Sequence, residues 1–535
     1  MSHSADVIVV GSGASAVHAA WPLVAAGHRV LMLDVGIEDD VYHRLIPPDA
    51  FDAIRRTDAA QHRYFLGDRF EGVPFGTMRV GAQLTPPRSF INRDVARHTP
   101  FEASNFFGME SLAVGGLAAG WGAGVGRFTS EELAGLPITL AELEPHYAAV
   151  ERRIGTCGED DDLTAGLGVH DAMMPPLPVD GNARYLLERY HRRRAASLDA
   201  GLRMGVTRLA ACSREHAGRG PHPLNDLDFW SDAARAVYRP RWTLDELRAR
   251  QNFTYAPGIV VQRFDERADA VAIDCHRVDG GEERFTARAL VIAAGVFGTA
   301  RIVLRSLGLY GREVPYVCNP YTYAPCLMPG VVGRDTVPAR HSLSQLTATF
   351  SPPGSGWPPM HVSVYSYRSL LTFKLIKESP LSARAGVRLM PALIPLLTIL
   401  GLHHADEPAP GKSVALLPAE GDRPERLRVA HPAGDGFTER MERHERMLFR
   451  EMRRLGCHPF KRVRPGPGSS IHYAGTFPMS DAPGELGTTR DGRLHGTQHV
   501  YLADGSLLQR LPAKGLTLTL MANADRVGTG VSARL

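Results

Sequence analysis

The first 35 residues divide into two apolar runs separated by a turn and a helical pattern. Residues 6–10 (DVIVV) form an apolar run of the kind found in a strand buried on both faces. A glycine-rich turn follows, and then a helical stretch that runs from Ser15 to Ala26 and ends at Gly27. A second apolar run, RVLML, covers residues 29–33. The pattern therefore predicts a βαβ unit of about 30 residues.

Further elements are predicted along the rest of the chain. Residues 139–154 place apolar residues at helical spacing, and Thr139 with Glu142 has the sequence of a capping box. Charged residues 436–455 predict a helix, and a last helix is expected from about Thr517. Strands are expected over residues 252–292, in HVYLADG near the C-terminus, and in two runs that would suit a sheet covering a site, HVSVYSY and SVALLP.

The turn after the first strand carries a nucleotide-binding pattern. Residues 11–16 (GSGASA) fit G-x-G-x-x-A, in which Gly11 permits the tight turn and Gly13 lets the backbone approach a pyrophosphate. Ser12, Ala14 and Ser15 complete the loop, and the pyrophosphate would sit at the start of the helix. Asp34 ends the second strand, where a carboxylate can accept hydrogen bonds from a ribose. The unit therefore predicts a bound dinucleotide, and its position at residue 6, followed by long insertions, favours FAD over NAD(P).

Five further stretches resemble the glucose–methanol–choline (GMC) oxidoreductase family, and they occur in that family's order. They are VGGLAAGWGAG (114–124), LPITLAELEPHYAAVERRIG (136–155), LVIAAGVFGTARIVLRS (290–306), SSIHYAGTFPM (469–479) and GRLHGTQHVYLADGSLLQRLPAKGLTLTLMANADRVG (492–528). Residues 310–455 have no such match. The resemblance implies an α/β fold with a Rossmann-like FAD-binding domain and a second, substrate domain built on a largely antiparallel sheet. We expect residues 1–155, 250–310 and 456–535 in the first domain, and 156–249 and 311–455 in the second.

The resemblance also assigns expected roles to individual residues. His472 matches the family's base, and a neutral imidazole can take a hydroxyl proton near pH 7. Gly515 stands where the family usually has a second His or Asn, so the group that orients the substrate is missing, and Lys514 or a group from elsewhere would have to replace it. Trp121 stands where some relatives attach the flavin through His, which predicts noncovalent FAD. The other expected cofactor contacts are Gly115, Gly116, Gly122, Val261, Ala294, Asp504, Gly505, Leu516 and Thr517.

Composition narrows the classes of partner. The formal net charge is +4, and no dense Lys/Arg tract with interleaved aromatic residues occurs, which argues against nucleic acid. The six cysteines are widely spaced without a C-x-x-C pair, so they predict reduced, buried thiols, and no His/Asp/Glu cluster has the spacing of a metal site. No signal peptide is visible, and a cytoplasmic protein is expected.

An apolar segment at residues 389–402 (LMPALIPLLTILGL) is too short to span a bilayer. Lys374, Lys377, Arg384 and Arg388 precede it. Three interpretations stay open: a buried wall of the substrate domain, a lid over an apolar site, or a peripheral contact with a membrane surface.

The leading functional hypothesis is FAD-dependent oxidation of an alcohol by hydride transfer to flavin N5, with His472 as base. A sugar, a glycosylated metabolite or a polyol-like alcohol is the expected substrate, since residues 136–155 resemble the sugar-oxidising branches of the family. The electron acceptor, oxygen or a carrier, is open. Two alternatives are a flavoenzyme with different chemistry (double-bond oxidation or isomerisation), suggested by Gly515, and a degenerate FAD-binding protein with an interaction role.

Overall fold

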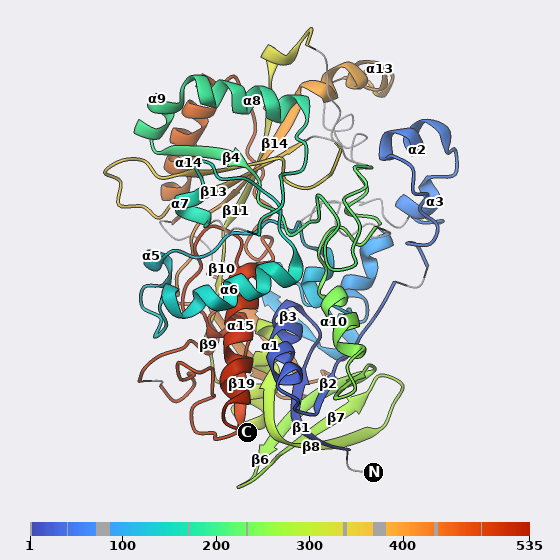
Figure 1. The fold of residues 1–535 in the computed structure, drawn as a ribbon, viewed down its shortest axis with the longest axis vertical. Helices are drawn as coiled ribbons and strands as arrows, with labels where there is room; N and C mark the ends of the chain where they lie inside the picture. The colour runs from blue at the N-terminus through green and yellow to red at the C-terminus, as the bar shows by residue number, and fades with distance from the viewer. Residues whose placement is uncertain are drawn as a thin grey trace.

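A largely parallel sheet forms one end of the molecule, at the bottom of Figure 1. The computed structural model describes residues 3–39, 41–70, 86–168, 172–231, 234–334, 340–366, 381–432, 437–482 and 484–535. Five strands of this sheet run parallel: β1 (His3–Val10), β2 (Val30–Leu33), β5 (Phe253–Ala256), β8 (Glu282–Ile292) and β19 (Val500–Leu502). Two antiparallel strands extend it: β6 (Ile259–Glu266) and β7 (Val271–Arg277). The predicted βαβ unit and the strand-rich stretch 252–292 are confirmed.

Helices from both ends of the chain pack together beside this sheet. Helix α1 (Ala14–Ala25) contacts α15 (Thr517–Ser532), which in turn contacts α6 (Leu140–Ile154), so the C-terminal helix lies next to the N-terminal one (Figure 1). Helix α6 begins with the predicted capping box, in which the Thr139 hydroxyl accepts from Glu142 N–H and the Glu142 carboxylate accepts from Thr139 N–H. Two more helices, α10 (Pro240–Arg248) and α11 (Val296–Ser306), pack against α1 and β6 respectively.

The second large sheet is antiparallel and lies at the other end of the molecule (Figure 1). Its strands, in spatial order, are β17 (His458–Pro459), β11 (Tyr321–Leu327), β14 (Leu397–His403), β13 (Met360–Ser366), β12 (Leu346–Phe350) and β4 (Leu202–Val206). Helices α8 (Gly181–Arg192) and α14 (Phe437–Arg454) cover one face of this sheet and share an apolar core with it. Because successive side chains of a strand point to opposite faces, the residues between these core positions face the other way, toward the first sheet.

Two smaller sheets connect the large ones. Four strands form the first: β3 (Phe101–Ser104), β16 (Arg426–Ala430), β15 (Ser413–Leu417) and β9 (Val314–Pro315). Strands β10 (Val317–Cys318) and β18 (Tyr473–Ala474) form the other. The run SVALLP is β15, so the expectation that it covers the site is wrong. Its Val414 and Leu416 are instead buried in the core shared with α11, because a short apolar run does not specify which sheet it joins.

Short helices fill the connections. These are α2 (Phe51–Thr57), α3 (His62–Phe65), η2 (Pro86–Asn92), α4 (Val95–His98), η3 (Gly116–Gly120), α5 (Ser130–Leu133), α7 (Thr164–Leu167), α9 (Arg194–Asp199), η4 (Pro329–Val331) and η6 (Gly505–Leu507). The domain boundaries stay a prediction. Strand β17 comes from residues 456–535 but pairs in the second large sheet, and β3 comes from residues 1–155 but pairs with β16. All six cysteines are free and buried, as expected.

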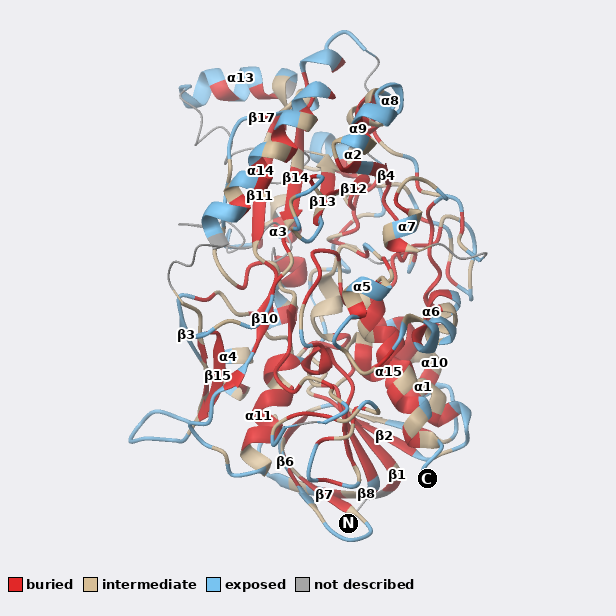
Figure 2. Cartoon of the chain, turned by 90° about the vertical axis from the view of Figure 1, so that its left-hand side faces the viewer, coloured by how far each residue is buried: buried red, intermediate tan, exposed pale blue. Residues whose placement is uncertain are grey.

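The apolar segment 389–402 changes structure along its length. It starts in α13 (Ala383–Leu393), passes through η5 (Ile394–Leu396) and ends as β14. The buried-wall interpretation holds for the strand, where Leu400 and Leu402 are fully buried. Helix α13 is largely exposed (Figure 2), with Val387 61% and Leu389 44% accessible. Lys374 and Lys377 lie outside the described residues. None of the described helices combines the length and apolar character needed to cross a membrane, and peripheral contact stays a prediction.

Candidate active site

A cavity of about 410 Å³ is lined by residues from both large sheets. Every residue that the sequence predicts to bind the cofactor or to act on the substrate lies on its wall. These are Gly11, Ser12, Gly13, Ala14, Ser15, Asp34, Gly115, Gly116, Trp121, Gly122, Val261, Ala294, His472, Asp504, Gly505, Lys514, Gly515, Leu516 and Thr517. The fold thus brings segments from residue 11 to residue 517 to one chamber. The individual roles stay predictions, and the geometry below shows what each region is suited to.

The glycine-rich turn forms a backbone cradle at one end of the cavity. Gly11 has φ +96°, and a Cβ there would lie 2.7 Å from the Ala293 carbonyl oxygen, so glycine is required. Gly13 caps α1 without a side-chain hydrogen bond, which leaves the first N–H groups of the helix open to a ligand. Gly116 faces Gly13, and a Cβ on Gly116 would lie 3.4 Å from the Gly13 Cα. This cradle fits a pyrophosphate on a helix N-terminus.

Asp34 is buried at the same end of the cavity. Its Oδ2 accepts from the Ser12 hydroxyl at 2.5 Å and from the Tyr255 hydroxyl at 2.9 Å. Burial raises the pKa of Asp34 to about 6, although both hydrogen bonds oppose the shift. The Ser12 hydroxyl also accepts from Gly115 N–H at 3.1 Å, which ties this corner to the second glycine-rich loop. The arrangement suits a ligand that carries hydroxyl groups.

Asp504 and Trp121 line the cavity farther along. Asp504 accepts from Ser506 N–H at 2.9 Å and from the hydroxyls of Ser506 and Thr299, so it holds the end of β19 against α11. Burial raises its pKa. The Trp121 indole N–H donates to the Tyr238 carbonyl at 2.8 Å. This bond fixes the indole ring. Trp121 has no imidazole nitrogen, so it cannot form the covalent bond to flavin that a histidine forms.

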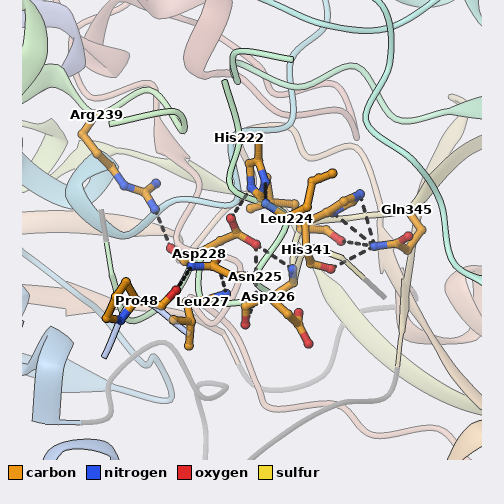
Figure 3. A network of polar contacts seen from close by, with 12 residues as sticks. Pro48, His222, Leu224, Asn225, Asp226, Leu227, Asp228, Arg239, His341 and Gln345 are labelled. Carbon is orange, nitrogen blue, oxygen red and sulfur yellow. Dashed lines mark hydrogen bonds and ion pairs between the residues drawn. The ribbon is translucent and has the colours of Figure 1, made fainter. Parts of the chain in front are cut away.

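Figure 3 shows a polar network around Asp228, which Arg239 connects to the loop that carries Trp121. Arg239 donates to the Trp121 carbonyl at 2.7 Å and to the Asp228 carbonyl at 3.0 Å. The Asp228 carboxylate lies 2.5 Å from His222 Nε2 and accepts from Ser342 N–H at 2.6 Å. Leu224 N–H donates to His222 Nδ1, so the proton of His222 is on Nε2 and is shared with Asp228. The network joins three loops that border the cavity, and sequence reasoning had no signal for it.

His472 is held in one orientation by Asn319. Its Nδ1 lies 3.0 Å from Asn319 Oδ1. The Asn319 amide nitrogen donates both hydrogens to backbone carbonyls, of His404 at 2.8 Å and Pro512 at 2.9 Å, so only its oxygen can face the imidazole. Nδ1 must therefore carry the proton, and Nε2 is left as the acceptor. Burial lowers the pKa of His472 to about 4, so the ring is neutral at pH 7.

The polar face of the antiparallel sheet forms another part of the cavity wall. His361, Ser363 and Tyr365 occupy alternate positions of β13, and His403 ends β14 beside them. Further polar side chains of this wall are Tyr321, Tyr323, Ser344 and Thr347. Sequence reasoning identified the strand around Val362 but not these contacts. The signal was present, since polar residues at a spacing of two interrupt apolar strands.

Lys514 and Gly515 occupy the wall near the start of α15. The Lys514 ammonium forms an ion pair with Glu132 at 2.6 Å and donates to the carbonyls of Arg127 and Gly166. An ammonium has three hydrogens, and protein acceptors take all of them. The expectation that Lys514 replaces the group missing at Gly515 is therefore not supported. Within the described part of the chain, a Cβ on Gly515 would meet only the Gly124 carbonyl oxygen, at 3.5 Å.

Comparisons with known proteins agree with this architecture. Residues 454–524 match the family model described as GMC oxidoreductase. The paromamine 6'-oxidase of Streptomyces fradiae is 28% identical, over 99% of this chain and 92% of the relative. The 6'''-hydroxyparomomycin C oxidase of Streptomyces lividus is 26% identical, with the same coverage. The crystal structure of pyridoxine 4-oxidase from Mesorbium loti covers 98% of this chain and 99% of its own, with a TM-score of 0.59 and 16% sequence identity. The chain is therefore similar to GMC oxidoreductases in its C-terminal residues 454–524, similar along nearly its whole length to two oxidases, and similar in fold to a third.

Proposed function

We propose that this protein binds FAD noncovalently and oxidises a hydroxyl group of a glycosylated alcohol, with His472 as the base. The observation that carries the proposal is a single cavity with a nucleotide cradle at one end and a neutral, oriented imidazole on its wall. The GMC family is generally FAD-dependent. The two Streptomyces relatives, which align with nearly the whole chain, are named for the oxidation of paromamine and of a hydroxyparomomycin.

The residues present fit FAD. The cradle of Gly11, Gly13 and Gly116 would hold the pyrophosphate, and Asp34 would accept from the adenosine ribose. We assign Asp504, which lines the same cavity and orders its loop through Ser506, to the flavin half of the cofactor. When bound, FAD supplies the acceptor for the hydride that leaves the substrate carbon.

His472 removes the hydroxyl proton as the hydride leaves. Its Nε2 is the free acceptor, because Nδ1–H is bonded to Asn319. A ring that is neutral at pH 7 can take a proton, whereas an imidazolium cannot. Asn319, at 1% exposure, touches neither substrate nor cofactor in this scheme and acts as a positioning residue.

The cavity wall formed by the antiparallel sheet suits a substrate with several hydroxyl groups. It presents imidazole, hydroxyl and phenol groups from β11, β12 and β13, each of which can form a hydrogen bond with a sugar oxygen. An alcohol with a long apolar chain would leave these polar groups unpaired, at a cost of about 1–3 kcal/mol for each buried group. The chamber therefore favours polyhydroxylated substrates over simple aliphatic alcohols.

Anaerobic bleaching of the flavin tests the proposal. The purified protein should carry FAD that is released by denaturation alone, and paromamine or another glycosylated alcohol should bleach it, whereas hexanol should not. His472→Ala should retain FAD and lower the rate of bleaching by about 100-fold or more. His495→Ala, a change of the same kind at an exposed position, should bleach at the wild-type rate. Absence of FAD, or equal bleaching of the two variants, would refute the proposal.

A further inference from the structure

We propose that His403 is a second catalytic residue, whose Nε2–H donates a hydrogen bond to the oxygen of the reacting hydroxyl. The inference rests on the proposed function and deepens it. In the GMC family a second His or Asn at the position of Gly515 orients the substrate, and the inference assigns that role to a residue of strand β14.

His403 lies beside the proposed base. It is the last residue of β14, and its ring is stacked on that of His472, with centroids 5.1 Å apart and planes at 20°. Tyr321 and His361 are its cross-strand neighbours on either side, so the three side chains form one row across the sheet. Both histidines line the cavity, and because their rings are stacked, we place the reacting hydroxyl where it contacts both.

The hydrogen bonds around His403 determine which nitrogen carries its proton. Nδ1 is buried, and within the described part of the chain it has no hydrogen-bond partner. A buried N–H without an acceptor costs about 1–3 kcal/mol, so the proton of a neutral ring belongs on Nε2. Burial and the neighbouring histidines hold the pKa of His403 well below its ordinary value, and the ring is neutral. His403 thus offers a donor where His472 offers an acceptor.

This pair matches the needs of an alcohol. The hydroxyl hydrogen points to His472 Nε2, and the hydroxyl oxygen accepts from His403 Nε2–H. In the reaction, the O–H proton passes to His472, the C–H hydrogen leaves as hydride to the flavin oxidant, and the carbon–oxygen double bond forms. The hydrogen bond from His403 stays on the oxygen throughout and stabilises the negative charge that builds up there.

Other groups on the wall are less suited to this role. Protein acceptors hold the Lys514 ammonium. His361 also has a buried Nδ1 without a partner in the described residues, but its ring packs against that of His403, with centroids 6.2 Å apart, and lies one strand farther from the base. His361 is therefore the matched control for His403, with the same chemistry on the same face of the sheet.

Nitrogen NMR of protein labelled with ¹⁵N-histidine tests the proton assignment without turnover. In the FAD-loaded protein, the signals lost in His403→Gln should be those of an Nε2–H tautomer, and those lost in His472→Gln should be those of an Nδ1–H tautomer. A His403 that carries its proton on Nδ1, or that is charged at pH 7, would overturn the inference. This outcome does not depend on whether any alcohol has been identified as substrate.

Rapid anaerobic mixing with paromamine, or with the glycosylated alcohol that bleaches the wild type fastest, tests the catalytic role. His403→Ala should lower the limiting rate of flavin reduction by about 100-fold, the effect of removing one donor to a developing oxyanion. His403→Gln, which retains an N–H donor, should recover at least part of that rate, and His361→Ala should lower it by less than about 10-fold. Equal losses in the His361 and His403 variants, or an unchanged rate in His403→Ala with FAD bound, would refute the role. If the wild type itself is not bleached, the proposed function fails and the catalytic role of His403 fails with it, whereas a wild type that is bleached with His403→Ala unaffected refutes the role of His403 alone.

Discussion

The position of Asn319 predicts that its side chain controls both the tautomer of His472 and the rate of flavin reduction. Asn319→Ala removes three hydrogen bonds, of 3.0, 2.8 and 2.9 Å, and leaves two buried carbonyl groups without this partner. At about 1 kcal/mol for each bond, the variant should lose about 3 kcal/mol of unfolding free energy. Urea denaturation of the purified variant measures this loss.

The kinetic effect follows from the freed imidazole. Without the bond to Asn319, Nδ1–H is no longer favoured, and the ring can rotate or carry its proton on Nε2, where it cannot accept one from the substrate. Loss of one bond of about 1 kcal/mol corresponds to about a fivefold loss of the competent form. We expect the rate of flavin reduction to fall about fivefold or more while FAD stays bound.

Asn319→Asp separates orientation from charge. A carboxylate still accepts from Nδ1–H, but its negative charge favours the imidazolium and should raise the pKa of His472 from about 4 toward its ordinary value. The rate should then fall with acid at a higher pH than in the wild type, an effect that the Ala variant should not show. Anaerobic stopped-flow over a range of pH measures both. A wild-type rate and pH profile in Asn319→Ala would refute the reasoning.

Three further predictions concern the other end of the cavity and the effect of pH. Flavin reduction in the wild type should be independent of pH near neutrality and should fall through about pH 4, since His472 must be neutral to act; a fall centred near pH 6.5 would contradict the burial argument. Gly13→Val should fold normally, because Gly13 lies at negative φ and a Cβ there would make only ordinary van der Waals contacts, 3.9 Å from the Gly115 carbonyl oxygen and 4.0 Å from the Gly116 Cα. Its side chain should fill the cradle and weaken FAD binding about 100-fold, measured by ultrafiltration of free FAD. Asp34 has a pKa raised to about 6, so in protein stripped of FAD its folded form binds protons more tightly than its unfolded form, and stability should decline as pH rises from about 4 to 6. Asp34→Asn should remove that decline, which amounts to about 3 kcal/mol of unfolding free energy. If the unfolding free energy of the two proteins depends on pH in the same way, the raised pKa of Asp34 is excluded as its cause.

Much of the cofactor end could be predicted from the sequence because it is local. The turn at Gly11, the start of α1 and the acid at the end of β2 lie within about 30 residues, where periodicity and backbone geometry decide the structure. The capping box that begins α6 and the start of α15 at Thr517 were predictable for the same reason. His472 was found through the resemblance of its surroundings to a family, since a single histidine in a loop carries no signal of its own.

Only the tertiary structure decided the partners of that histidine. Asn319 lies 153 residues away from His472 along the chain, and no periodicity connects the two. The neighbouring ring of His403 comes from β14, whose place in the sheet depends on pairing with β11 and β13. The same limit explains why SVALLP lies in a different sheet from the one expected, and why the sequence does not show that Glu132 pairs with Lys514, the candidate replacement for the group missing at Gly515. Sequence patterns determine local geometry and burial, whereas the contacts that set a proton on one nitrogen arise from segments that meet only in the folded chain.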